Sequence, residues 1–218
     1  GLLALLSCLT YTPLERQALA PGMIIPLYVY PFGDADPDRY DPSGVRAAYG
    51  VDDVYAAVAR VAKSVPTVTV VAVVNPNNGP GTARDPNYQA AIDRLVSAGV
   101  VVIGYVPLTF GKRPLAEVKR DLNRWRFNYT GVSGVFYDEV PVADAPSDPH
   151  PVRRYLVSVA QSARELGAEL LVGNPGRGVP RDYFAQDLFD IVVLYENVGW
   201  PQADSAILST ARQKTLAA

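Results

Sequence analysis

The sequence has one cysteine and one histidine among its 218 residues, and this scarcity excludes several kinds of site. Because Cys8 has no second cysteine to pair with, the chain forms no internal disulfide. One thiol and one imidazole cannot supply a thiolate or His-rich metal site, so we expect no metal and no cofactor. His150 stands among prolines and no GxSxG segment occurs, which argues against a Ser-His-Asp triad. Carboxylates are the catalytic groups that remain.

An excess of one charge is also missing. Lys and Arg number 20, Asp and Glu number 22, and the two signs are interspersed along the chain. We therefore expect no nucleic-acid partner and no membrane-surface role for the main domain. The Asn-, Pro- and Gly-containing loops at 75–81 and 173–176 lack a following Lys-Ser/Thr, and no dinucleotide fingerprint occurs, so they are weak candidates for phosphate cradles.

The first residues, GLLALLSCLT, are apolar and lie outside the regular pattern that follows. They resemble the end of a secretory signal whose start is missing, and Cys8 after Leu5-Leu6-Ser7 resembles a lipoprotein lipid acceptor. The alternative is an ordinary buried segment. We expect 1–20 to be a signal remnant, with a second candidate cleavage site at 18–20, and 21–218 to be one catalytic domain. The protein is then a secreted or envelope-anchored monomer, with no membrane contact apart from a lipid on Cys8.

From residue 23 onward, apolar runs alternate with amphipathic segments. This alternation predicts a parallel sheet with right-handed crossovers, and both an open doubly wound sheet and a (β/α)8 barrel fit it. Nearly every strand ends in polar or aromatic residues, which favours the barrel. About six of its eight strands are visible, so we expect the domain to be incomplete at its C-terminal end. The predicted strands are 23–31, 67–75, 100–109, 132–140, 169–174 and 191–197, and the predicted helices are 51–64, 87–98, 114–129, 150–166, 181–186 and 203–216.

Two of these strands end in acids. VSGVFYDEV ends in Asp138 and Glu139, and IVVLYEN ends in Glu196. Parallel strands bring such residues to one rim, which favours acid/base chemistry. Neighbouring side chains on a strand face opposite ways, so the backbone must turn after Asp138 for both acids to reach the rim. The alternatives are that Asp138 caps a loop, Glu139 faces solvent and Glu196 forms a surface ion pair.

Other residues near strand ends are candidates for binding a substrate. Tyrosine and tryptophan rings stack on sugar faces, although most tyrosines in a barrel are core residues. The two asparagines either bind substrate or shape their turns, and the arginine binds substrate, pairs with a rim acid or marks a helix start. An acidic loop with Asp34, Asp36, Asp38 and Asp41 suits solvent better than Ca²⁺. The substrate-binding candidates are Tyr28, Tyr30, Asn75, Tyr105, Arg113, Tyr137, Asn174, Tyr195 and Trp200.

Six blocks of the sequence occur in an order that points to a known family. They are MIIPLYVYP, NPNNGPG, GYVPLTFGKR, GVFYDEV, GNPG and LYEN, and they span residues 23–197. In this order they resemble the spherulin-4-like proteins of glycoside hydrolase family 135. The resemblance implies a secreted (β/α)8 barrel with endo action on α-1,4-linked N-acetylgalactosamine. The family's functional acids fall on Asp138, Glu139 and Glu196.

The expected function is therefore hydrolysis of a polysaccharide that contains galactosamine or N-acetylgalactosamine. Retaining, inverting and substrate-assisted routes all remain open, because the sequence does not fix the distance between the acids. The alternative from another class is a carbohydrate-binding or cell-surface protein that keeps the barrel without turnover.

Overall fold

A computed structural model of the protein describes residues 22–31, 54–142, 151–180, 183, 188–194 and 196. Within these ranges six strands occur in the predicted order, and a helix lies between each consecutive pair of the first five. The predicted helix at 181–186 lies almost entirely outside the described residues. The elements are β1 (Gly22–Leu27), α2 (Val54–Ser64), β2 (Thr69–Val74), α3 (Pro86–Ser97), β3 (Val101–Pro107), the 3-10 turn η1 (Thr109–Gly111), α4 (Leu115–Asn128), β4 (Val132–Asp138), α5 (Pro151–Glu165), β5 (Leu170–Gly173) and β6 (Ile191–Val192).

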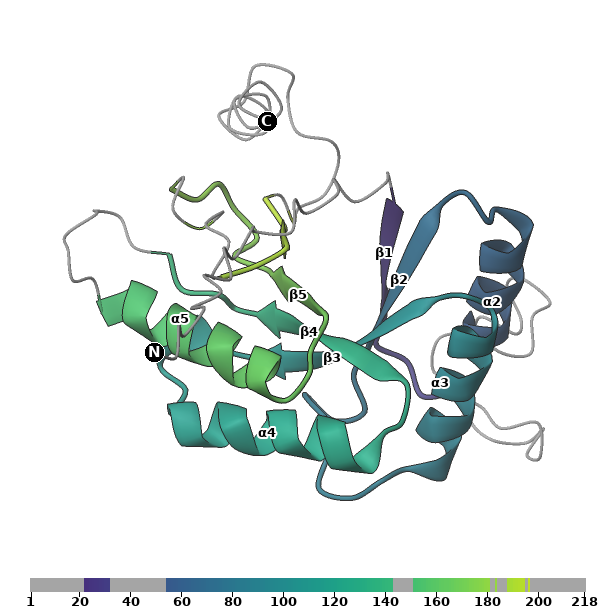
Figure 1. The fold of residues 1–218 in the computed structure, drawn as a ribbon, viewed down its shortest axis with the longest axis horizontal. Helices are drawn as coiled ribbons and strands as arrows, with labels where there is room; N and C mark the ends of the chain where they lie inside the picture. Colours follow the sequence, from purple (N-terminus) through teal and green to yellow (C-terminus); the bar gives the residue numbers. More distant parts are fainter. Residues whose placement is uncertain are drawn as a thin grey trace, which may run out of the picture.

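The strands form one parallel sheet in the order β1-β2-β3-β4-β5-β6. The sheet curls strongly, with α2 to α5 along its outer side (Figure 1). Each strand pairs with its sequence neighbour, which is the arrangement of a barrel wall and not that of a doubly wound sheet. The described part of the chain is thus a half-barrel, and the closure by eight strands that we expected is not confirmed.

The central strands β2, β3 and β4 are largely buried on both faces, which is why they read as continuous apolar runs. The outer face packs against the helices in a large core that includes Tyr137 of β4 and Leu156 and Val159 of α5. The inner face, which no described helix covers, carries a second cluster made only of strand residues. Its buried members are Val71, Val73, Ile103, Tyr105, Phe136 and Val172.

Local signals fix where the elements begin and end. Asp85 caps α3 by accepting hydrogen bonds from the backbone of Asn87 and Tyr88, and Pro86 occupies the first turn. Gly99 follows α3 with φ of 81°, a left-handed value that suits a helix stop. The helix therefore ends where the sequence predicted.

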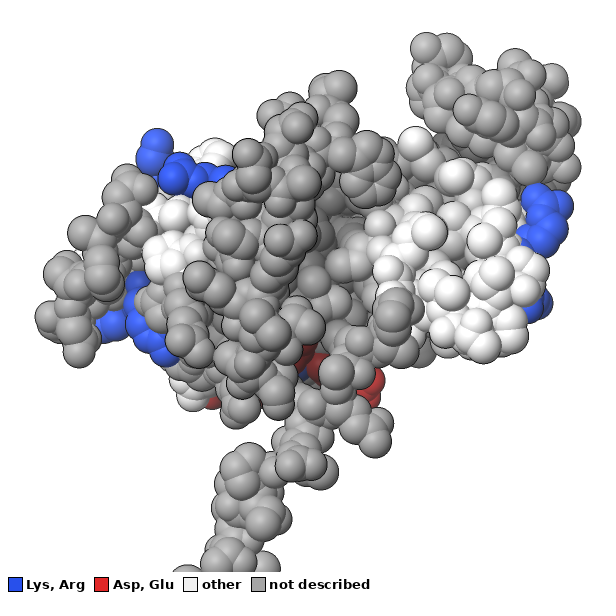
Figure 2. Space-filling model, turned by 90° about the horizontal axis from the view of Figure 1, so that it is seen from above, with Lys and Arg blue, Asp and Glu red and all other residues white. Residues whose placement is uncertain are grey.

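Several sequence predictions lie outside the described residues. These are the leader at 1–20 with Cys8, the acidic loop with Asp34, the loop with His150, the last helix, and the two aromatic residues Tyr195 and Trp200. Among the described helices, none combines the length and the apolar character needed to cross a membrane. On the face in Figure 2, Lys and Arg side chains lie toward the two ends of the view.

Candidate active site

The two acid-bearing strands meet at the carboxyl end of the sheet. β4 pairs with β5 so that Tyr137 lies opposite Gly173, and the next residues of the two strands are Asp138 and Asn174. Phe136 and Val172, two positions earlier, belong to the inner cluster. Side chains alternate between faces along a strand, so Asp138 and Asn174 start on the inner side of the rim.

Asp138 accepts three hydrogen bonds there. The Tyr105 hydroxyl donates to Oδ2 at 2.7 Å, and the Asn174 amide donates to Oδ1 at 2.8 Å. The backbone N–H of Glu139 donates to Oδ1 at 2.8 Å. Every partner is a donor, and an ionised carboxylate is a pure acceptor. The surroundings of Asp138 are therefore those of a negatively charged carboxylate.

Asn174 joins Asp138 to the third acid. Its Nδ2 also donates to Oε2 of Glu196 at 2.8 Å, and its Oδ1 accepts the backbone N–H of Gly176 at 3.0 Å. The side chain is buried, with an exposed fraction of 4%. Both protons and the oxygen of the amide are thus engaged within the protein. Asp138 Oδ1 and Glu196 Oε2 each lie 2.8 Å from the Asn174 nitrogen, so the distance between these two oxygens is at most twice 2.8 Å.

The backbone turns at Glu139, as the pair of adjacent acids requires. β4 ends at Asp138, and Glu139 has a φ of 52°, in the left-handed region that non-glycine residues rarely adopt. The carbonyl of Glu139 accepts the N–H of Phe110 at 2.8 Å, and the N–H of Val140 donates to the carbonyl of Asn174 at 3.1 Å. Neighbouring chain segments therefore hold the strained residue from both sides.

Two tyrosines lie beside the acids. The rings of Tyr28 and Tyr105 contact edge to face, with centroids 5.4 Å apart. Burial raises the pKa of Tyr105 above its ordinary value, and its hydrogen bond to Asp138 raises it further. The pKa of Tyr28 is also raised, first by partial burial and then by the charges of Asp138 and Glu196. Both hydroxyls consequently remain protonated donors across the neutral range.

This geometry can be set beside known proteins. The model of Spherulation-specific family 4 matches residues 22–215. The chain belongs to this family. Spherulin-4 of Physarum polycephalum is 27% identical over 193 residues, which are 88% of this chain and 49% of that protein. The family assignment confirms the resemblance read from the six ordered blocks.

The structure of Aspergillus clavatus Sph3 in complex with GalNAc is similar to that of this family member. Its TM-score is 0.58 at 25% identity, over 81% of this chain and 66% of Sph3. The chain spans about half the length of the curated relative and 66% of that structure. The likeness supports a barrel-type fold for the described strands.

In this family member, two of the predicted aromatic residues lie away from the acids. Tyr137 is 0% exposed, on the outer face, and its hydroxyl donates to the carbonyl of Val159 at 2.8 Å. The Tyr30 hydroxyl donates to Asp85 at 3.0 Å, at the start of α3. The structure places both among the helices, so we leave them out of the proposed site.

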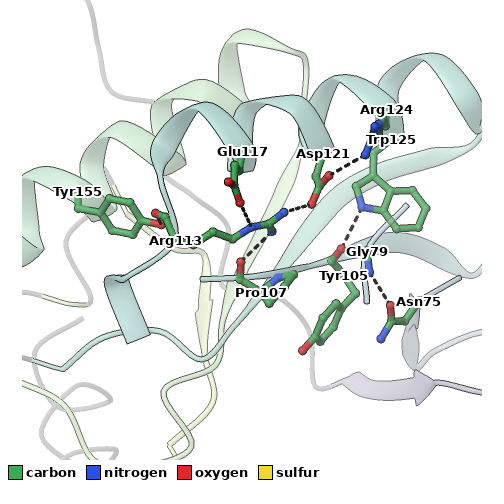
Figure 3. Close-up of polar contacts among 10 residues, drawn as sticks. All are labelled: Asn75, Gly79, Tyr105, Pro107, Arg113, Glu117, Asp121, Arg124, Trp125 and Tyr155. Carbon is green, nitrogen blue, oxygen red and sulfur yellow. Dashed lines mark hydrogen bonds and ion pairs between the residues drawn. The ribbon is translucent and has the colours of Figure 1, made fainter. Parts of the chain in front are cut away.

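Arg113 and Asn75 are engaged in local structure. The Arg113 guanidinium pairs with Asp121 and lies 3.7 Å from a Glu117 oxygen, while its Nη1 donates to the Pro107 carbonyl at 3.0 Å (Figure 3). It therefore ties α4 to the end of β3 and does not pair with a rim acid. Asn75 Oδ1 accepts the Gly79 N–H at 2.7 Å, which supports the turn reading of its loop.

Two glycines shape the packing around the site, a role that the sequence analysis did not predict. A Cβ on Gly104 would lie 2.5 Å from the ring of Trp125, and one on Gly173 would lie 2.6 Å from the ring of Phe189. Each glycine directly precedes a site residue, Tyr105 or Asn174. Aromatic rings can therefore pack closely behind the rim, and the Trp125 indole also donates to the Tyr105 carbonyl at 3.0 Å (Figure 3). In the sequence, the signals that could have identified these glycines are the pairs Gly104-Tyr105 and Gly173-Asn174.

The described residues contain no group of three or more His, Cys, Asp or Glu arranged to hold a metal ion. The chemistry that the rim offers consists of carboxylates, tyrosine hydroxyls and one bridging amide.

Proposed function

We propose that the protein is a glycoside hydrolase that cleaves a polysaccharide containing galactosamine or N-acetylgalactosamine. The observation that carries the proposal is the Asn174 amide, which bonds Asp138 and Glu196 from two separate strands at 2.8 Å each. Two carboxylates on either side of a scissile glycosidic bond are the machinery of most such enzymes. Membership of the family and the likeness to GalNAc-bound Sph3 support an amino sugar as the substrate.

The three acids take different roles. Asp138 accepts hydrogen bonds from Tyr105, Asn174 and the Glu139 backbone, so it orients its neighbours and stabilises positive charge that develops on the sugar. Glu196 is exposed, and its Oε1 has no hydrogen bond from the described residues. Glu139 lies at the rim with its carboxylate similarly unused by the described chain. Glu139 and Glu196 are therefore the groups that exchange protons with the leaving group and with water.

The roles of the acids favour a substrate-assisted, retaining outcome. Asp138 shares the Asn174 amide with Glu196, so an orienting carboxylate lies beside an acid that exchanges protons. Retention follows when the sugar's own N-acetyl group is the nucleophile and an acid orients it.

The setting of the reaction is part of the same proposal. A polymer substrate and an apolar leader at 1–20 both suit a secreted or envelope-anchored monomer whose partner is the polysaccharide itself.

The test is release of oligosaccharides from partially deacetylated galactosamine polymer by the full chain. Glu139→Gln and Glu196→Gln each remove one ionisable group while keeping its size, and each should lower turnover by at least about 100-fold. Glu165→Gln on the exposed face of α5 is the matched control and should cut at the wild-type rate. Circular dichroism and melting temperature establish that all three variants are folded.

Each outcome is informative. If the Glu139→Gln, Glu196→Gln double variant cuts as fast as wild type, the acids are not the catalytic groups. If the wild-type chain binds the polymer and releases nothing, the carbohydrate-binding alternative replaces hydrolysis.

A further inference from the structure

Phe110 is an aromatic residue at the rim that the proposed acid chemistry leaves unused. It lies in η1, directly after β3, and 62% of its surface is exposed. An exposed phenyl ring gives up the free energy that burial would provide, since apolar surface is most stable away from water. Its exposure leaves the ring accessible to a ligand.

The backbone at Phe110 is also strained. Thr109 and Phe110 have φ values of 50° and 52°, so two consecutive non-glycine residues are left-handed. This conformation costs an L-residue free energy that glycine does not pay, and strain of this kind gathers at ligand sites. Gly111, the next residue, already adopts positive φ at 80°. Phe110 nevertheless carries a large side chain at a position where glycine would adopt the backbone conformation without strain.

Hydrogen bonds fix the strained turn against the acids. The N–H of Phe110 donates to the carbonyl of Glu139 at 2.8 Å, and the N–H of Leu108 donates to the carbonyl of Asp138 at 2.9 Å. Two backbone hydrogen bonds therefore join the turn after β3 to the end of β4. The backbones of Phe110 and Glu139 are therefore in contact, so both side chains start from the same part of the rim.

We propose that Phe110 forms a sugar-binding subsite next to the acids. Its ring stacks on the C–H face of a pyranose unit that neighbours the bond to be cleaved, and the strained turn holds the ring outward for this contact. This subsite rests on the proposed function for its location, because it names the residue that grips the polymer beside the scissile bond. Aromatic stacking of this kind contributes about 0.5 to 1.5 kcal/mol, which is a 2- to 12-fold change in affinity.

Binding is measured without turnover, in a chain that carries Glu196→Gln. Phe110→Ala in that chain should weaken binding of a galactosamine oligomer in calorimetry by about 3- to 10-fold. Phe127→Ala is the matched control, because Phe127 is 79% exposed in the last turn of α4, near the start of β4 and thus at the opposite end of the sheet. It should bind as the parent does. In the active chain, Phe110→Ala should raise KM with little change in kcat.

Phe110→Gly separates binding from folding. Glycine relieves the left-handed strain, so this variant should melt at a higher temperature than the parent and still bind the oligomer weakly. A lower melting temperature would show that the ring supports the fold, and it would overturn the subsite.

The results also separate the subsite from the hydrolase proposal. Weaker binding by Phe110→Ala in a chain that never cleaves polymer leaves the subsite standing and removes hydrolysis. Normal cleavage with unchanged KM and affinity in Phe110→Ala leaves hydrolysis standing and overturns the subsite. A wild-type chain that neither binds nor cleaves amino-sugar polymer overturns both.

Discussion

Asn174 donates a hydrogen bond of 2.8 Å to Asp138 from the neighbouring strand, and the same nitrogen donates to Glu196. A primary amide has two protons, and here each one meets a carboxylate from a different segment of the chain. Two carboxylates this close repel each other unless donors lie between them. We infer that Asn174 sets the spacing of the acids.

Replacing Asn174 tests that inference. Asn174→Ala should lower kcat by about 10- to 100-fold with a small change in KM, because the acids lose their shared donor. Asn174→Asp adds a third carboxylate, so the acidic limb of the pH–rate profile should move to higher pH as the like charges resist ionisation. The measurement is a full pH–rate profile for each variant.

Asn87→Ala supplies the comparison, since Asn87 donates to Tyr30 at 2.8 Å away from the acids. It should lose stability of about 1 kcal/mol and keep the wild-type profile. Identical profiles in Asn174→Asp and wild type would show that the amide has no part in the chemistry.

Tyr105→Phe removes the hydroxyl that donates to Asp138 at 2.7 Å and keeps the ring. Hydrogen bonds to a charged acceptor contribute about 1.5 to 3 kcal/mol, so kcat should fall by at least 10-fold if Asp138 acts as a charged group. Tyr137→Phe is the matched control, because its hydroxyl donates to the Val159 carbonyl on the outer face. It should lose stability and leave kcat unchanged. Both variants are measured by kcat and by urea unfolding. If Tyr137→Phe lowered kcat and Tyr105→Phe lowered only the stability, the tyrosine that supports catalysis would be Tyr137 on the outer face.

This pair of tyrosines shows what the sequence predicts and what it misses. The order of strands and helices followed from apolar runs and helix caps, and two of the acids predicted at strand ends, Asp138 and Glu196, share the Asn174 amide. Tyr105 and Tyr137 look equivalent because both lie near the end of an apolar strand buried on two faces. Strand alternation separates them, since Tyr137 directly precedes Asp138 and must face the helices when Asp138 faces the rim.

The bridging role of Asn174 depends on contacts between distant parts of the chain. Asn174 bonds Asp138, which is 36 residues away, and Glu196, which is 22 residues away. No local pattern in a single sequence specifies these contacts.

Gly104→Ala tests the packing behind Tyr105. A Cβ at this position would lie 2.5 Å from the Trp125 ring, so the indole must shift and its 3.0 Å bond to the Tyr105 carbonyl must break. Overpacking of this kind costs about 1 to 3 kcal/mol. The urea midpoint should fall, and kcat should fall with it because Tyr105 loses its support.

A double-mutant cycle identifies the cause. Trp125→Leu alone should destabilise the protein by removing a core ring, yet it should offset part of the cost of Gly104→Ala in the same chain. If the losses of stability in Gly104→Ala and Trp125→Leu simply add in the double variant, a Cβ at residue 104 does not clash with the Trp125 indole.

The tyrosines also predict how the fold responds to alkaline pH. Tyr88 is 3% exposed, and burial followed by the charge of Asp85 raises its pKa to about 12. Below pH 10 the folded and unfolded chains both hold this proton, so the stability is fully present. Between pH 10 and about 12 the unfolded tyrosine ionises first, and stability should fall by about 1.4 kcal/mol per pH unit for this group.

Tyr88→Phe tests this pH dependence, because it keeps the ring and removes the ionisable proton. The unfolding free energy of the variant should decline less steeply than that of wild type. It is measured with urea at intervals across that pH range. Parallel declines in the two proteins would show that Tyr88 ionises at the same pH in both states.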